Sequence, residues 1–334
     1  MERFLKSKYK IGDQIGESPF SITYKGTTLD GERPLVIKIY KRALLNNELI
    51  KIVKKKVRNL REISHHNIAK ILDGDYGWQG FYFVREFIEG KSLAEIMDIK
   101  DPLDVSKATK IAQSICEALH PAHEMGVIHG ALKPENVFLA SGNVVKVADF
   151  VVYGALRAGP SQTSKTIMER AKYLSPEEVK GEEPKKASDI YLIGVLLYQM
   201  LTARHPFEGS ELDVALAHIK EEPEPPTKFN SKIPDHLEDI IYKAMEKDPM
   251  LRFESVAELL SSLKSKSVVD SRHVIHIPDI SLDTSIDVAK EKELSEDEGK
   301  GKKKNRLKFW LILLVSAAVL TGIWYAVFTS VLFK

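Results

Sequence analysis

A series of short motifs in a fixed order constrains the fold of this chain more than any other feature of its sequence. In chain order the motifs are Leu35-Val36-Ile37-Lys38, His65-His66-Asn67-Ile68, His129-Gly130-Ala131-Leu132-Lys133-Pro134-Glu135-Asn136, Val147-Ala148-Asp149-Phe150, Tyr173-Leu174-Ser175-Pro176-Glu177, Asp189-Ile190-Tyr191 and Asp248-Pro249-Met250-Leu251-Arg252. Any one of them is a weak signal on its own. Their order and spacing together argue against a chance origin and predict one fold between Tyr9 and Leu263.

The segment from His129 to Asn136 resembles the catalytic loop of serine/threonine protein kinases, which reads H-R-D-L-K-P-E-N. The other motifs resemble the remaining landmarks of that family, and overall the chain looks like a bacterial-type receptor kinase. The resemblance implies an α+β fold of two lobes, with a small β-rich lobe at 9–87 and a large helical lobe at 91–264. The kinase-like domain at 9–264 would follow an N-terminal extension at 1–8.

Within this resemblance, Ala131 stands where the family has its catalytic aspartate. That aspartate accepts the proton of the substrate hydroxyl during phosphoryl transfer. A methyl group can neither accept a proton nor orient the attacking oxygen. Lys133, which resembles the lysine that contacts the γ-phosphate, is retained. The catalytic loop therefore indicates a kinase fold and argues against kinase chemistry, with no intact catalytic set.

The resemblance also assigns binding roles to retained residues. Gly16, Lys38 and Lys133 are candidates for contacts with a nucleotide, and Asn136 and Asp149 are candidates for Mg²⁺ ligands. The family's G-x-G-x-x-G loop, however, reads Gly16-Glu17-Ser18-Pro19-Phe20-Ser21 here. Glycines let backbone N–H groups approach the phosphates closely, whereas proline has no N–H to offer. We therefore expect binding of ATP and Mg²⁺ to be weak or absent.

Two basic residues occupy positions at which the family has other side chains. Lys56 lies nine residues before His65, where the resemblance places the helix glutamate that holds Lys38, and Arg85 falls on the gatekeeper position behind the adenine pocket. The three cations would converge behind one cleft, with Asp149 as the nearest expected anion. Like charges in a partly dry cavity repel each other. Two outcomes stay open: an anion binds there, or Lys56 faces water.

Three further departures fall on the phosphate-handling part of the large lobe. Gly130 replaces the arginine that reads a phosphorylated activation loop, Val151 replaces the D-F-G glycine, and Arg170 replaces a threonine that bridges the catalytic aspartate and the lysine. By contrast, the residues that hold the lobes together match the family. These are the apolar stack Leu60, Ile71, His129 and Phe150, its anchor Asp189, and the ion pair of Glu177 with Arg252.

The C-terminal part of the sequence predicts a membrane anchor. Residues 309–333 form a run of 25 residues without a charge, longer than the ~20 residues that cross a bilayer core. A basic cluster at 300–308 precedes the run, so the positive-inside bias predicts a single-pass protein with a cytoplasmic kinase-like domain and the C-terminus outside. Residues 265–308 have the charged composition of a juxtamembrane linker.

Composition limits the partners of the chain. The net charge is only +2, which does not indicate nucleic acid as a partner. The single cysteine, Cys116, suits a reducing compartment and a place in the core. Ala318, Gly322 and Ala326 recur every four residues in the predicted span and could form the contact face of a homodimer, although small residues also occur there as lipid-facing filler.

Three hypotheses for the function stay open at this point. The first is a membrane-tethered pseudokinase that acts as a scaffold or allosteric partner of signalling proteins. The second is an active but atypical serine/threonine kinase that uses another carboxylate, such as Glu135 or one from a partner. The third is a sensor whose regulated event is the binding of a nucleotide or another anion. Phosphate transfer separates the second hypothesis from the others, and a binding titration separates the third from the first.

Overall fold

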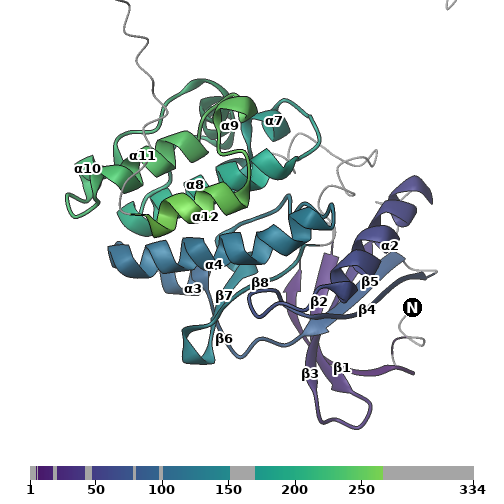
Figure 1. The fold of residues 1–334 in the computed structure, drawn as a ribbon. Helices are drawn as coiled ribbons and strands as arrows, with labels where there is room; N and C mark the ends of the chain where they lie inside the picture. Colours follow the sequence, from purple (N-terminus) through teal and green to yellow (C-terminus); the bar gives the residue numbers. More distant parts are fainter. Residues whose placement is uncertain are drawn as a thin grey trace, which may run out of the picture. The chain divides into compact units, whose positions relative to one another are not determined.

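A computed structural model describes most of the chain between residues 5 and 265. The described residues are 5, 7–17, 21–41, 47–77, 80–97, 101–150 and 170–265. By its internal contacts the chain divides into two units, Met1–Val269 and Asp270–Lys334, and all described residues belong to the first. That unit contains a small lobe built on a sheet and a large lobe built mostly of helices (Figure 1).

The small lobe is an antiparallel sheet of five strands in the order β1-β2-β3-β5-β4. The strands are β1 (Tyr9–Glu17), β2 (Ser21–Thr28), β3 (Pro34–Lys41), β4 (Ile71–Gly77) and β5 (Gly80–Glu86). Val36 lies opposite Arg85, and Lys38 lies opposite Phe83, in the register of β3 with β5. Because side chains alternate between the two faces of a strand, Val36, Lys38 and Arg85 lie on the same face of the sheet.

One helix, α2 (Asn47–Glu62), packs against this sheet beside β4. Its buried residues Val53, Val57 and Leu60 recur at the spacing of one helix face. They join Phe81 and Phe83 of β5 in the main hydrophobic core. Helix α2 thus connects the sheet to the core that continues into the large lobe.

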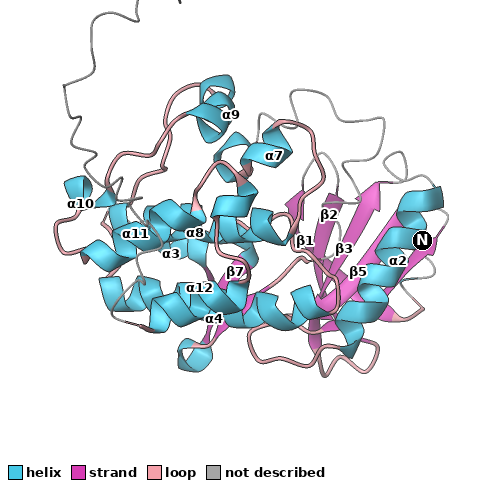
Figure 2. Ribbon diagram, turned by 45° about the horizontal axis from the view of Figure 1, so that its top comes forward, coloured by secondary structure: helices cyan, strands magenta, loops and turns pink. Residues whose placement is uncertain are grey.

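The large lobe consists mostly of helices (Figure 2) and contains a three-stranded sheet of order β6-β7-β8 that contacts α3 and α4. Its elements are β6 (Gly90–Ser92), α3 (Leu93–Met97), α4 (Val105–Glu124), η2 (Pro134–Asn136), β7 (Val137–Ala140), η3 (Ser141–Asn143), β8 (Val145–Val147), η4 (Ala171–Tyr173), α7 (Pro176–Val179), α8 (Lys186–Thr202), α9 (Glu211–Lys220), α10 (Pro226–Phe229), α11 (Asp235–Ala244), η5 (Pro249–Leu251) and α12 (Val256–Lys264). Helix α8 is buried along nearly its whole length, and α4 packs against both α8 and α12. Cys116 on α4 is fully buried, as predicted.

The residues predicted to join the lobes are all buried. Leu60, Ile71 and Phe150 belong to the main core, and the rings of His129 and Phe150 have centroids 4.7 Å apart. Asp189 at the start of α8 accepts hydrogen bonds from the backbone nitrogens of His129 (2.9 Å) and Gly130 (2.8 Å). The stack and its anchor are therefore present in the structure, and Asp189 holds the backbone at the start of the catalytic-loop segment.

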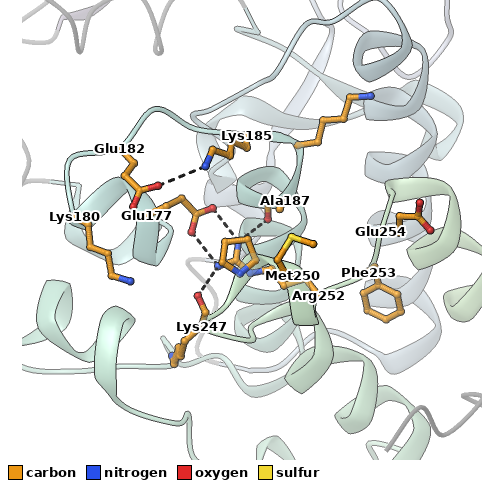
Figure 3. Close-up of a pocket in the computed structure, with 12 residues that line it drawn as sticks. Glu177, Lys180, Glu182, Lys185, Ala187, Lys247, Met250, Arg252, Phe253 and Glu254 are labelled. Atoms are coloured by element: carbon orange, nitrogen blue, oxygen red, sulfur yellow. Dashed lines mark hydrogen bonds and ion pairs between the residues drawn. The ribbon is translucent and has the colours of Figure 1, made fainter.

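The predicted buried ion pair is also present. The guanidinium of Arg252 forms two parallel hydrogen bonds of 2.9 Å to the two carboxylate oxygens of Glu177 (Figure 3). The side chains of Arg252 and Glu177 are 0% and 3% exposed. A cavity of about 780 Å³ lies beside the pair, and Lys180, Lys186 and Met250 contribute to its lining. The pair ties α7 to the segment that follows η5.

Several predictions fall on residues that the structure does not describe. They concern the loop at Ser18, Pro19 and Phe20, the residue Val151, the linker beyond Ser265 and the membrane span at 309–333. Among the described residues, no helix combines the length and apolarity that a membrane crossing requires.

Candidate functional site

The candidate site lies where the two lobes meet. Strand β3 supplies Lys38, the end of β5 supplies Arg85, and the residue pair after β8 supplies Asp149. The segment between α4 and β7 supplies Ala131 and Lys133. Residues more than 100 positions apart in the sequence thus contribute to one site.

Lys38 and Asp149 form a short ion pair. Lys38 Nζ donates to Asp149 Oδ2 at 2.6 Å, and the side chains are 20% and 14% exposed. Asp149 has a φ of +65°, in the left-handed region that residues other than glycine seldom adopt. Such local strain is held by the surrounding structure and is typical of functional positions. The structure therefore brings together two of the predicted binding residues.

Arg85 adds a second cation to the same carboxylate. Its Nε donates to Asp149 Oδ1 at 3.3 Å, and its Nη1 donates to the backbone carbonyl of Glu86 at 3.1 Å. Its Cζ lies 5.5 Å from the centroid of the Phe138 ring, within cation–π range. Arg85 as a whole is only 7% exposed. The buried guanidinium thus contacts a carboxylate, a backbone carbonyl and an aromatic ring.

The charge of Asp149 is set by these two cations. Burial by itself would raise the pKa of the Asp149 carboxyl, but the positive charges of Lys38 and Arg85 outweigh burial and hold that pKa well below its ordinary value. Asp149 is therefore ionised at neutral pH, with each of its carboxylate oxygens engaged by a cation. Its negative charge offsets part of the repulsion between the cations of Lys38 and Arg85.

Lys56 is neither fully exposed nor fully buried, so it lies between the two outcomes left open for it. Lys56 on α2 is half-buried, and burial lowers the pKa of its ammonium group, while the carboxylates of Asp189 and Glu183 oppose that shift. The neighbouring α2 positions Val53 and Val57 are buried, so this part of the helix lies against the core. Among the described residues, the carboxylate that pairs with Lys38 is Asp149.

Hydrogen bonds hold the backbone of the catalytic-loop segment, although position 131 carries no carboxylate. Ala131 is 7% exposed, its N–H donates to His129 Nδ1 at 3.2 Å, and its carbonyl accepts from Asn136 Nδ2 at 2.9 Å. Lys133 Nζ lies 3.8 Å from Glu135 Oε1. Burial lowers the pKa of Lys133, Glu135 opposes the shift, and the charges of Lys38 and Arg170 add to it.

Gly16 lies near the end of β1, opposite Thr23 of β2. A β-carbon placed on Gly16 would meet the Thr23 side chain at 3.7 Å, an ordinary van der Waals contact. The packing described here therefore does not require glycine at this position. The loop that follows, with Ser18 and Pro19, lies outside the described residues.

The resemblance implies ATP and Mg²⁺ as ligands, but the described residues do not fit them in this arrangement. Mg²⁺ binds oxygen ligands in near-octahedral geometry, yet both carboxylate oxygens of Asp149 are already engaged by cations. Within the described part of the chain, no group of three or more acidic, histidine or cysteine side chains could hold a metal ion. The Arg85 guanidinium also donates a hydrogen bond to the backbone carbonyl of Glu86.

Sequence reasoning identified Arg85 as unusual but missed two of its contacts. Phe138 on β7 was not singled out, and the bond from Arg85 to the Glu86 carbonyl was not predicted. The available signal was the combination of an arginine at the gatekeeper position with an aromatic residue on the facing strand. Such a pair favours a stacked guanidinium.

Comparisons with known proteins identify what the chain is similar to. The family described as "Protein kinase domain" matches residues 9–263. A probable serine/threonine-protein kinase of Clostridium perfringens is 34% identical over 264 residues, which cover 78% of this chain and 38% of the relative. The serine/threonine-protein kinase PrkC of Bacillus subtilis is 29% identical over 330 residues, which cover 93% of this chain and 51% of PrkC.

The chain thus spans between 38% and 51% of the length of these two curated relatives. Among solved structures, the crystal structure of Rad53 1–466 in complex with AMP-PNP is similar, with a TM-score of 0.63 and 21% sequence identity. The similarity covers 77% of this chain and 65% of that one. At this level of identity it demonstrates a shared fold alone.

Proposed function

The chain belongs to the protein kinase family, with that family's two-lobed fold, and we propose that it is a catalytically impaired member that acts as a scaffold or allosteric partner in signalling. The observation that carries the proposal is Ala131, a buried methyl group at the position of the catalytic base. The contacts of Asp149 support it, because this candidate metal ligand is already paired with both Lys38 and Arg85. Binding of ATP and Mg²⁺ is accordingly weak or absent.

The test is phosphate transfer by the purified full chain with labelled ATP, Mg²⁺ and a generic protein substrate. Loss of a general base typically costs about 10²–10⁴-fold in rate, so we expect turnover far below the ~1–100 per second of active kinases. Ala131→Asp alone should not restore activity, because losses among residues that act as a unit are not additive. Autophosphorylation by the wild type at a normal rate, abolished by Lys38→Ala, would refute the proposal.

The same assay addresses an atypical kinase that uses Glu135 as its base. The Glu135 side chain is 53% exposed, and its Oε1 lies 3.8 Å from Lys133 Nζ. Phosphate transfer that the wild type carries out and Glu135→Gln does not would establish this alternative instead.

We also propose that residues 309–333 anchor the protein as a single-pass span, with the kinase-like domain in the cytoplasm and the C-terminus outside. The support comes from the sequence: 25 residues without a charge, preceded by the basic cluster at 300–308. The partners are then signalling proteins at the membrane, and the net charge of +2 does not favour nucleic acid.

A further prediction concerns pairing of this anchor. Because Ala318, Gly322 and Ala326 would line one face of a helical span, two such helices could pack closely along that face. We expect Gly322→Ile to reduce the dimer signal in a membrane-association reporter, whereas Leu320→Ile should not, since position 320 lies off the face. Equal signals from the wild type and Gly322→Ile would make the small residues incidental.

A further inference from the structure

We propose that Arg85 is an internal plug: its guanidinium occupies the adenine end of the cleft and excludes adenine nucleotides. The inference rests on the proposed function only in that the cleft between the lobes corresponds to the family's nucleotide site. It is otherwise independent of phosphate transfer, because it concerns the space and the polar groups that a purine would need.

The position of Arg85 follows from the register of the sheet. Arg85 lies opposite Val36, so both side chains project from the face of the sheet that carries Lys38. From there the guanidinium reaches the ring of Phe138 on β7, in the other lobe. The side chain thus bridges the sheet of the small lobe and the small sheet of the large lobe, through the space between them.

The polar contacts of Arg85 take the groups that would otherwise be open to a ligand. Its Nη1 donates to the Glu86 carbonyl at 3.1 Å, at the point where β5 runs into the connection between the lobes. Its Nε donates to Asp149 at 3.3 Å. A purine that entered this end of the cleft would need the same carbonyl and the same flat face of Phe138.

Opening the plug is therefore costly. Removing one partner from a buried ion pair corresponds to about 10²–10⁴-fold in an equilibrium. The apparent affinity of a ligand falls by the fraction of molecules in which its site is open. A plug that is closed in all but a small fraction of molecules thus weakens nucleotide binding by the same factor, without any change in Lys38 or Lys133.

The test compares the full chain with Arg85→Met, which keeps an apolar side chain of similar length but has no donors. We expect AMP-PNP to bind Arg85→Met at least about tenfold more tightly than the wild type in calorimetric titrations. Adenosine should show the same gain, because it reports on the adenine end alone. Inorganic tripolyphosphate should not bind Arg85→Met more tightly than the wild type, since removal of a cation can only weaken the binding of an anion.

Two matched variants control the comparison. Arg85→Lys keeps the charge but loses the planar fork, so it should recover only part of the gain. Arg58→Met removes an exposed arginine from α2 and should bind like the wild type. If Arg85→Met unfolds, as judged by circular dichroism, Arg85→Thr serves the same comparison with a smaller side chain.

The outcomes distinguish the plug from the proposed function. Equal adenosine affinity in the wild type and in both Arg85→Met and Arg85→Thr overturns the plug and leaves the impaired catalysis intact. Tight adenosine binding by the variants without phosphate transfer supports both. Phosphate transfer by the wild type at about 1–100 per second, with a Michaelis constant for ATP that falls in Arg85→Met, overturns the impaired catalysis and supports the plug.

Discussion

Replacement of Arg252 by methionine is expected to lower the free energy of unfolding by about 3–5 kcal/mol, the usual cost of removing one partner from a buried ion pair. Methionine fills much of the same space, so the loss comes from polar groups. Glu177 would remain buried as a carboxylate without its cation, although the Ser188 hydroxyl, at 2.6 Å, would still donate to it. The carbonyls of Ala187 and Glu246 would lose donors at 2.8 and 2.7 Å.

The measurement is urea unfolding at pH 7, followed by circular dichroism. Lys228→Met is the matched control, because Lys228 pairs with Glu224 in an ion pair whose two side chains are 59% and 57% exposed. Surface pairs contribute little, so the control should unfold at the wild-type midpoint. The double variant Glu177→Gln, Arg252→Met should lose less than the sum of the two single losses, since the partners interact directly. Equal midpoints for Arg252→Met and Lys228→Met would contradict the prediction.

The pair of Glu177 with Arg252 was predictable because each partner belongs to a short motif with a fixed place in the fold. The same holds for the stack of Leu60 and Phe150, whose apolar side chains have no alternative to burial. Local motifs of this kind specify the backbone on which they lie. The two lobes and their connection could therefore be predicted from the order of the motifs.

The site could be predicted only in part, because long basic side chains take their direction from tertiary neighbours. The sequence placed Arg85 near Asp149 but left open which way its guanidinium points, and the ring of Phe138 lies 53 positions further along the chain. The direction of the Lys56 side chain was left open for the same reason. A lysine between apolar helix positions can extend the aliphatic part of its side chain over the core. The sequence alone does not reveal how α2 is rotated about its axis.

Stability of the described domain is expected to fall as the pH drops from about 7 toward 4, and His218 is a principal cause. Burial on α9, together with the nearby charge of Lys247, lowers the pKa of His218 to about 3 in the folded protein, although backbone carbonyls of Ala171 and Lys172 oppose the shift. The ring is packed against Phe207, and the Tyr191 hydroxyl lies 2.8 Å from Nδ1. Folding therefore keeps this imidazole neutral.

The sign of the effect follows from the two pKa values. In the unfolded chain a histidine titrates near 6.5, so below that pH the unfolded state binds a proton that folded His218 does not accept. Its contribution is complete above pH 6.5 and is lost as the pH falls toward 3. The pKa of His205, lowered to about 4 by burial, acts in the same direction. Between pH 7 and 4.5 each of the two histidines should account for about 2–3 kcal/mol.

The measurement is the free energy of unfolding in urea at pH steps from 7.5 to 4.5, for the wild type and for His218→Gln. Glutamine can still hydrogen-bond Tyr191 but does not titrate, so the variant should show a shallower pH dependence even if it is less stable at pH 7.5. His120→Gln, which removes an exposed histidine from α4, should run parallel to the wild type. The carboxyls of Asp149, Asp189 and Glu177, whose pKa values are lowered, add their own loss only as the pH falls below about 4.5, outside this window. Parallel curves for His218→Gln and the wild type would show that His218 is not held neutral by the fold.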